Sequence, residues 1–221
     1  MSHTSITYQP PKHTGLDILF QDEHLLAVNK PTGLLSVPGN SLEKQDCMVS
    51  RCQAEFEHIL IVHRLDMLTS GIIVFARNKA ALRAMNKLFA EREVSKTYIA
   101  IVDGIVNNDE GEINQPLMAD WPNRPKQKID AEGKASCTQY QVLHRDEISQ
   151  TTRIKLTPMT GRSHQLRVHM MWLGHPILGD PFYATDEALH KSERLLLHAS
   201  ELAFVHPMTN QPINIHCPPA F

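Results

Sequence analysis

The residues best suited to chemistry in this 221-residue chain lie in the stretch 63–77, which reads HRLDMLTSGIIVFAR. It begins with an imidazole, a guanidinium and the carboxylate of Asp66, and continues through a turn predicted at 69–71. The apolar run 72–76 follows, and four of its five residues are β-branched or aromatic, which predicts a buried strand. A carboxylate on a loop held by a buried strand is in a common position for a reacting group.

Asp66 also has a purely structural interpretation. Its carboxylate would then hydrogen-bond to the backbone near Thr69 and Ser70, and Arg64 would be a surface charge. The length of the pattern HRLDxxTSG favours the chemical interpretation.

Other patterns that announce a known chemistry are absent from the sequence. It contains no Walker A loop, no GxGxxG after a predicted strand and no GxSxG elbow. Thirteen histidines raise the hypothesis of a metal-dependent hydrolase, but His164 and His169 would point to different faces of a helix, and no group has the spacing of a zinc site. The four cysteines form no CxxC pair, so we expect reduced thiols and no bound metal.

A second set of candidate residues is basic. The segment 121–128, WPNRPKQK, places Arg124 and Lys126 close to Trp121. It is either a solvated loop or a nucleic-acid-binding loop that offers phosphate contacts and a stacking surface. The net charge of −2 argues against binding by bulk charge but allows a local basic surface. An RNA-binding module without catalytic activity is therefore an alternative to an enzyme.

The elements that must position these residues follow from hydrophobic periodicity. Strands are predicted at 17–21 and 24–28 as a hairpin, and at 72–76, 96–102, 138–143, 152–156, 195–198 and 213–215. Helices are predicted at 48–56, at 78–92 with Asn78 as its cap, and at 163–173 with Ser163 as its cap and Gly174 as its stop. The polar stretch 107–137 predicts a long loop. Because strands outnumber helices and often follow one another directly, the fold class is predicted to be α+β on a largely antiparallel sheet.

The domain organisation is predicted to be simple. We expect a polar N-terminal arm over 1–15 and a single domain over 16–221. No apolar run approaches the length of a membrane span, and the first residues lack a signal-peptide core. We therefore expect a cytoplasmic protein that does not bind a membrane.

Five motifs, in order along the chain, resemble those of the RluA family of pseudouridine synthases. They are KPTG at 30–33, HRLDMLTSG at 63–71, KTY at 96–98, GRSHQLRVH at 161–169 followed by GHPILGD at 174–180, and LLLHA at 195–199. The resemblance extends from Asp17 to the C-terminus.

The resemblance implies a pseudouridine synthase-like α+β fold. Its central sheet would be mixed and largely antiparallel, with flanking helices and loops and an active-site cleft across the sheet. An S4-type RNA-binding domain, which many members carry before KPTG, is expected to be missing. The implied reaction converts uridine in RNA to pseudouridine without a cofactor or metal. The implied substrates are large-subunit (23S) ribosomal RNA and tRNA anticodon stem-loops, bound by a monomer.

The resemblance also implies a role for each matching residue. Asp66 would be the catalytic carboxylate, with three routes left open: attack on the ribose C1′, attack on the base, or formation of a glycal intermediate. Arg167 would pair with Asp66 and keep it ionised, and catalytic Tyr98 would lie against the target base. Arg64 would fill the gap left by the flipped nucleotide, and Leu197 would line the base pocket. The other residues expected to bind substrate are His63, Arg124, Lys126, Arg162 and His164.

Overall fold

The computed structural model describes residues 8–221, so the first seven residues of the predicted N-terminal arm lie outside the described part. The described chain forms two compact units. One, called here the Asp66 unit, comprises residues 8–96 and 198–220; the other, the Arg167 unit, comprises 97–197 with Phe221. Compact units of this kind do not test whether the chain is one domain, so the single domain predicted over 16–221 stays a prediction.

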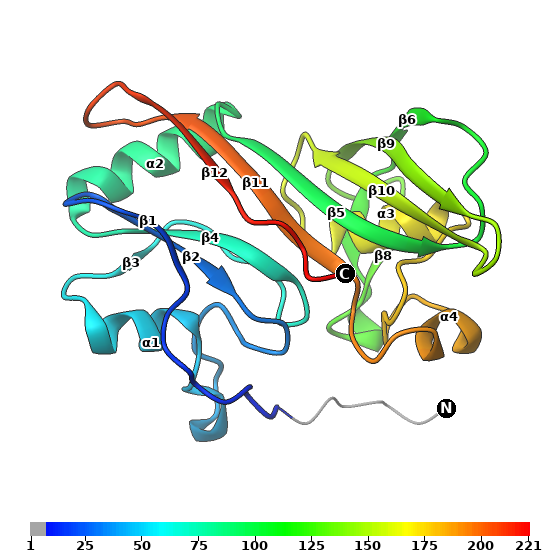
Figure 1. Ribbon diagram of the computed structural model, residues 1–221, viewed down its shortest axis with the longest axis horizontal. Coiled ribbons are helices and arrows are strands. Elements are labelled where there is room, and N and C mark those ends of the chain that lie inside the picture. The colour runs from blue at the N-terminus through cyan, green and yellow to red at the C-terminus, as the bar shows by residue number, and fades with distance from the viewer. Residues whose placement is uncertain (1–7) are drawn as a thin grey trace. The chain divides into compact units, whose positions relative to one another are not determined.

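The Asp66 unit is built on a mostly antiparallel sheet in which β4 lies between β2 and β11. In Figure 1 the red strand β12 runs beside the orange strand β11, with which it pairs. Antiparallel pairs join β1 to β2, β2 to β4, β3 to β4 and β11 to β12, whereas β4 and β11 are parallel. The elements are β1 (Ile18–Gln21), β2 (Leu25–Lys30), η1 (Leu42–Lys44), α1 (Met48–Glu55), β3 (Leu60–Ile61), β4 (Ser70–Ala76), α2 (Lys79–Glu91), β11 (Leu197–Val205) and β12 (Pro212–His216).

Strand β4 forms the centre of this unit's core, because all of its residues are buried. Its residues Ile72 and Val74 pack with Met85 of α2 and with apolar residues of β2, β11 and β12. The side chain of Asn78 accepts a hydrogen bond from the Ala81 amide at 2.8 Å, so the predicted cap of α2 is confirmed.

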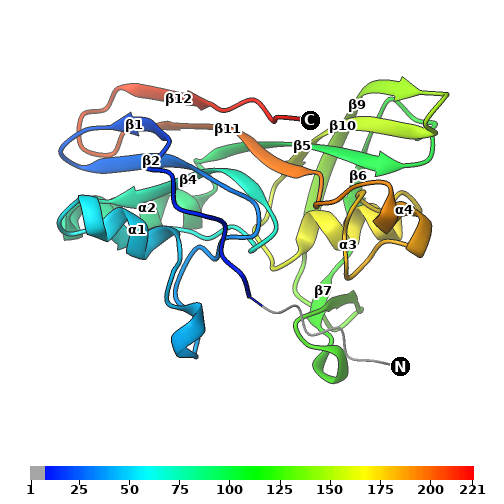
Figure 2. The ribbon, with the colours of Figure 1, turned by 60° about the horizontal axis from the view of Figure 1, so that its bottom comes forward.

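The Arg167 unit contains an antiparallel sheet in the order β5-β10-β9-β6 and a separate hairpin, β7-β8. Figure 2 shows this hairpin projecting beside α3. The elements are β5 (Ser95–Asp103), β6 (Glu110–Asn114), β7 (Leu117–Ala119), η2 (Trp121–Asn123), β8 (Gln127–Ile129), β9 (Cys137–Asp146), β10 (Thr151–Pro158), α3 (Gln165–Trp172) and α4 (Asp186–His190).

Most of the predicted elements are confirmed, but the stretch 107–137 is not a long structureless loop. It contains β6, the β7-β8 hairpin and η2. Only Ile113 of the five residues of β6 is buried, so this edge strand lacks the apolar signal of an interior strand. The two hairpin strands have three residues each, too few for a periodic pattern.

Two predicted boundaries also differ from the structure. Ser70 and Gly71 belong to β4 rather than to a turn before it. Ser163 does not cap α3, which begins at Gln165 with His164 as its N-cap. The side-chain oxygen of Gln165, the first residue of α3, accepts the Arg162 amide at 3.1 Å and so binds the turn that precedes the helix.

Candidate active site

Asp66 lies in a loop between β3 and β4, and the backbone of this loop is tightly bound. The Thr69 amide donates to the Asp66 carbonyl at 3.1 Å. On the other side, the Ser36 hydroxyl donates to the Leu65 carbonyl at 2.7 Å and accepts the Leu65 amide at 3.0 Å. The residues on both sides of Asp66 are therefore fixed by hydrogen bonds, two of them from a segment about thirty positions earlier in the chain.

Lys30 supports the same loop from the end of β2 and is completely buried. Its ammonium group donates to three carbonyls, those of Pro31 (2.9 Å), Leu34 (2.7 Å) and Met67 (3.1 Å). Two residues later, the Thr32 hydroxyl donates to the Leu68 carbonyl at 2.6 Å. The KPTG motif thus binds the backbone that follows Asp66. The sequence shows only a lysine close to the end of an apolar run, and this pattern did not predict the contact.

His63 uses one ring nitrogen to stabilise β4. Its Nε2 accepts the Val74 amide at 3.0 Å, and its ring stacks on Phe89 with 4.9 Å between centroids. Burial, and then the charge of Lys96, lower the pKa of His63 to about 4, so the ring is neutral with its proton on Nδ1. Its predicted role in binding substrate stays a prediction; Arg64, its neighbour, is exposed.

The end of HRLDMLTSG contacts LLLHA directly. Gly71 has φ +107° and lies so close to β11 that a Cβ atom would be 2.2 Å from the Ala199 carbonyl oxygen. His198 Nε2 lies 2.9 Å from the Cys217 carbonyl, to which it must donate, so its Nδ1 accepts the Ser70 hydroxyl at 2.9 Å. The two motifs are therefore matched both in backbone spacing and in hydrogen bonding.

Arg167 lies in α3 of the other unit and is buried. Its Nε and Nη2 donate to the two carboxylate oxygens of Asp180 at 2.8 and 2.7 Å. The rings of Phe182 and Tyr183 each lie 5.2 Å from its guanidinium carbon. Asp180 is a partner of Arg167 that was not predicted from the sequence, although this residue closes the GHPILGD motif. The predicted pair of Arg167 with Asp66 stays a prediction.

His164 belongs to the same cluster through Tyr183. Its Nδ1 lies 2.7 Å from the Tyr183 hydroxyl, which also accepts the Gln127 amide at 2.8 Å. His164 has φ +54° and is the N-cap of α3, so it lies just before the helix that carries Arg167. Tyr183 therefore connects the start of α3 with the β7-β8 hairpin.

The remaining predicted residues occupy different parts of the Arg167 unit. Tyr98 is half-buried in β5, and Leu197 is buried at the first position of β11. Arg162 is exposed, and its Nε donates to the Ala135 carbonyl at 3.3 Å. The structure brings Arg124 and Lys126 together in the loop that joins β7 to β8.

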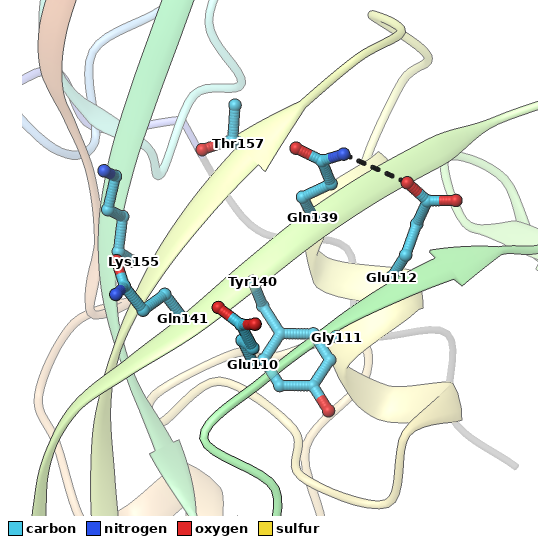
Figure 3. A pocket seen from close by; sticks show the side chains of 8 residues that line it. All are labelled: Glu110, Gly111, Glu112, Gln139, Tyr140, Gln141, Lys155 and Thr157. Carbon is cyan, nitrogen blue, oxygen red and sulfur yellow. Dashed lines mark hydrogen bonds between the residues drawn. The ribbon is translucent and has the colours of Figure 1, made fainter.

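A polar groove also lies in the Arg167 unit. Figure 3 shows its lining on β6, β9 and β10, with Gln139 donating to Glu112 at 3.1 Å. None of the predicted site residues lines it. Within 8–221, no three His, Cys, Asp or Glu side chains gather as they would around a metal ion. In the same range, every helix is too short or too polar to cross a membrane.

The sequence and fold define the class of protein. Residues 24–172 match the family model described as RNA pseudouridylate synthase, so the chain belongs to this family of RNA isomerases. Human RNA pseudouridylate synthase domain containing 1 has a similar structure, with a TM-score of 0.80 and 28% identity, covering 96% of this chain and 87% of that one. Human RNA pseudouridylate synthase domain containing 4 is also similar, with a TM-score of 0.72 and 28% identity, covering 92% of this chain and 89% of that one. The predicted α+β pseudouridine synthase fold is confirmed.

Similar curated proteins carry a more particular name, "Dual-specificity RNA pseudouridine synthase RluA". The protein of that name from Vibrio parahaemolyticus is 55% identical over 217 residues, which cover 96% of this chain and 87% of the relative. Those from Pasteurella multocida and Escherichia coli are 52% and 50% identical and cover 98% and 97% of this chain. The matched residues make up 99% of the Pasteurella multocida protein and 98% of the Escherichia coli protein. The predicted membership of the RluA family is confirmed.

Proposed function

We propose that this protein isomerises specific uridines to pseudouridine in large-subunit (23S) ribosomal RNA and in tRNA anticodon stem-loops. The observation that carries the reaction is the loop of Asp66, in which buried side chains bind the backbone on both sides of a carboxylate. Relatives named for dual specificity match almost the whole chain and support the two classes of substrate.

The reaction breaks the bond between N1 of uracil and C1′ of ribose, and forms a bond between C5 and C1′. The proton on C5 is lost and N1 gains one, so no atom is gained or lost overall. The target uridine must leave the base stack before C1′ and C5 can be reached. Arg64 is proposed to fill the gap that the nucleotide leaves.

We assign the chemistry to Asp66, Arg167 and Tyr98. The Asp66 carboxylate assists cleavage of the glycosidic bond by one of the three routes given above. Arg167 keeps this carboxylate ionised, because a neighbouring cation lowers the pKa of an acid in a dry pocket. Tyr98 lies against the base and assists proton transfer at the product stage, and Leu197 supplies apolar surface to the base pocket.

Substitution of Asp66 tests the reaction. Asp66→Asn should fold and bind RNA but form no pseudouridine in 23S and tRNA transcripts. Asp109→Asn is the matched control, because this carboxylate is exposed and pairs with Arg145 at 2.7 Å; it should retain wild-type turnover. Full activity of Asp66→Asn would exclude the assignment.

The substrate classes are tested separately, by mapping pseudouridine in total RNA from cells with and without the gene. Loss at a ribosomal site and in several tRNAs would support dual specificity. Loss at one site would retain the reaction and reject the second substrate. No loss anywhere, with the protein expressed, would favour the RNA-binding module without catalytic activity.

We also propose that the protein acts as a monomer in the cytoplasm. Light scattering after size exclusion should give the mass of one 25.0 kDa chain, free and with a bound stem-loop. A mass near twice that value would reject the monomer, and recovery of the protein in a membrane fraction would reject the location.

A further inference from the structure

The loop between β7 and β8 exposes a large aromatic ring. Trp121 begins η2 and is 66% exposed. The guanidinium carbon of Arg124 lies 3.7 Å from the centroid of its ring, so the cation covers the indole. The exposed indole gives the loop a large flat ring on which another ring can stack.

The backbone of this loop fixes the position of Trp121. The Asp120 amide donates to the Lys126 carbonyl, and the Lys126 amide to the Asn123 carbonyl, both at 3.0 Å. Asn123 donates to Asp120 twice, from its amide at 3.0 Å and from its side chain at 2.9 Å. Stacking of a ligand on Trp121 would therefore cost little conformational entropy, because the loop is already ordered.

The base of the hairpin is anchored to the body of the same unit. Leu117 of β7 and Ile129 of β8 pack with Val168 of α3 and with Tyr183. The Gln127 amide adds a hydrogen bond to the Tyr183 hydroxyl at 2.8 Å. The hairpin is thus held at its base and presents its loop outward (Figure 2).

The charge of the loop suits an anionic partner. Segment 120–128 contains three cationic side chains and one carboxylate. Lys128 pairs with Asp130 at 2.7 Å, and the carboxylate of Asp120 accepts from Asn123. Arg124 and Lys126 therefore supply the positive charge beside Trp121, as a phosphate backbone requires.

We propose that Trp121 and Arg124 form a platform on which an unpaired base of the substrate RNA stacks, while Lys126 contacts a phosphate. The proposal rests on the function proposed above and adds a binding subsite outside the reacting centre. Stacking on an aromatic ring beside cations is typical of single-stranded RNA binding and tolerates every base. The platform therefore selects RNA that offers an unpaired base at this position.

Tryptophan fluorescence tests the contact directly, because the chain has only two tryptophans. Trp172 lies at the end of α3, and Trp172→Phe leaves Trp121 as the single emitter. A synthetic RNA stem-loop with a uridine-containing loop should quench this emission as it binds. The same stem-loop with abasic sites in its loop should bind without the quenching. Equal emission with and without the intact RNA would overturn the platform.

Affinity gives an independent test, with Trp172→Ala as the matched loss of an exposed tryptophan. Trp121→Ala should raise the Kd for the stem-loop roughly 5- to 150-fold, the range expected for one stacked base, with turnover at saturating RNA and the salt dependence unchanged. Lys126→Gln, which removes the proposed phosphate contact, should instead reduce the slope of log K against log salt by about one. Trp121→Ala that binds like wild type would overturn the stacking contact.

These outcomes are distinguishable from failure of the proposed function. If the wild-type protein binds and modifies the stem-loop while Trp121→Ala does so with the same Kd, only the platform fails. If the wild-type protein neither binds nor modifies any RNA, the proposed function itself fails, and the platform fails with it.

Discussion

Arg167 and Asp180 form a buried pair in which two parallel hydrogen bonds of 2.8 and 2.7 Å join the guanidinium to the carboxylate. The Asp180 carboxylate also accepts the Phe182 amide at 2.9 Å, so its own orientation is fixed. A planar guanidinium bound at two points cannot rotate without losing both bonds. Asp180 therefore fixes the orientation of the Arg167 guanidinium. This contact is a structural function for the last residue of the GHPILGD motif.

Substitution of Asp180 should be strongly destabilising. Asp180→Asn keeps the shape but removes the negative charge that two buried guanidinium nitrogens require, at a cost of about 3–5 kcal/mol in the free energy of unfolding. Urea denaturation measures this loss. Glu187→Gln is the control, because Glu187 is largely exposed and its 3.3 Å pair with Lys191 should contribute less than about 1 kcal/mol. Similar midpoints for the two variants would show that the buried pair does not stabilise the fold.

Lys30 should matter both for stability and for turnover. Lys30→Met fills a similar volume but removes the donor for three carbonyls, so we expect a loss of about 3 kcal/mol or more. Because Met67 directly follows Asp66, turnover at saturating RNA should fall even at temperatures where the variant is folded. Urea denaturation and single-turnover assays measure the two effects.

The control for Lys30 is Lys87→Met on α2. Lys87 is 72% exposed and lies 3.9 Å from Glu91, so its loss should cost no more than about 0.5 kcal/mol and leave turnover unchanged. A Lys30→Met protein that is as active as this control would show that the carbonyl contacts do not position the Asp66 loop.

The elements that were predicted correctly are those whose sequence pattern is formed by neighbouring residues. The alternation of β10, the apolar run of β4 and the Asn78 cap of α2 each depend on neighbouring residues, and all three are confirmed. The short strands of 107–137 were missed, because one buried residue in an edge strand or three residues in a hairpin leave no periodic signal. The Ser163 cap was wrong, because α3 begins two residues later, at Gln165, with His164 as its N-cap.

In the candidate site, too, features formed by neighbouring residues were predicted, whereas contacts between distant residues were not. The motif around Asp66 was recognisable because its residues are consecutive. The contacts that support it join residues far apart in the chain, such as Lys30 with Met67 and Ser70 with His198. A single sequence carries no signal for such pairs, so the partners of Lys30 and Arg167 became visible only in the structure. The burial of a lysine and an arginine was the physical clue that each needed partners.

Gly71 should not tolerate a side chain. Gly71→Ala combines a φ of +107° with a Cβ atom 2.2 Å from the Ala199 carbonyl, so β4 and β11 would have to separate. We expect a loss of at least about 3 kcal/mol, or no soluble protein. Gly161→Ala is the control, since no atom lies within 4 Å of a Cβ there. Equal thermal midpoints for the two variants would contradict the close approach of the strands.

His63 should make stability depend on pH. Its pKa is about 4 in the folded protein, below the ordinary value of 6.5 that applies when the chain is unfolded. The unfolded chain therefore binds a proton more readily, so the stabilisation is complete above about pH 6.5 and is lost as the pH falls toward 4. The shift corresponds to roughly 3 kcal/mol.

His63→Gln isolates this contribution, because its amide oxygen can still accept the Val74 amide but does not titrate in this range. The variant should be less stable than wild type at pH 7, and urea denaturation should show that the difference shrinks as the pH is lowered from 6.5 to 4. His216→Gln is the control, because this side chain is 63% exposed. Its difference from wild type should stay within about 0.5 kcal/mol over the same range. A constant difference between wild type and His63→Gln would show that the neutral ring of His63 does not contribute to the pH dependence.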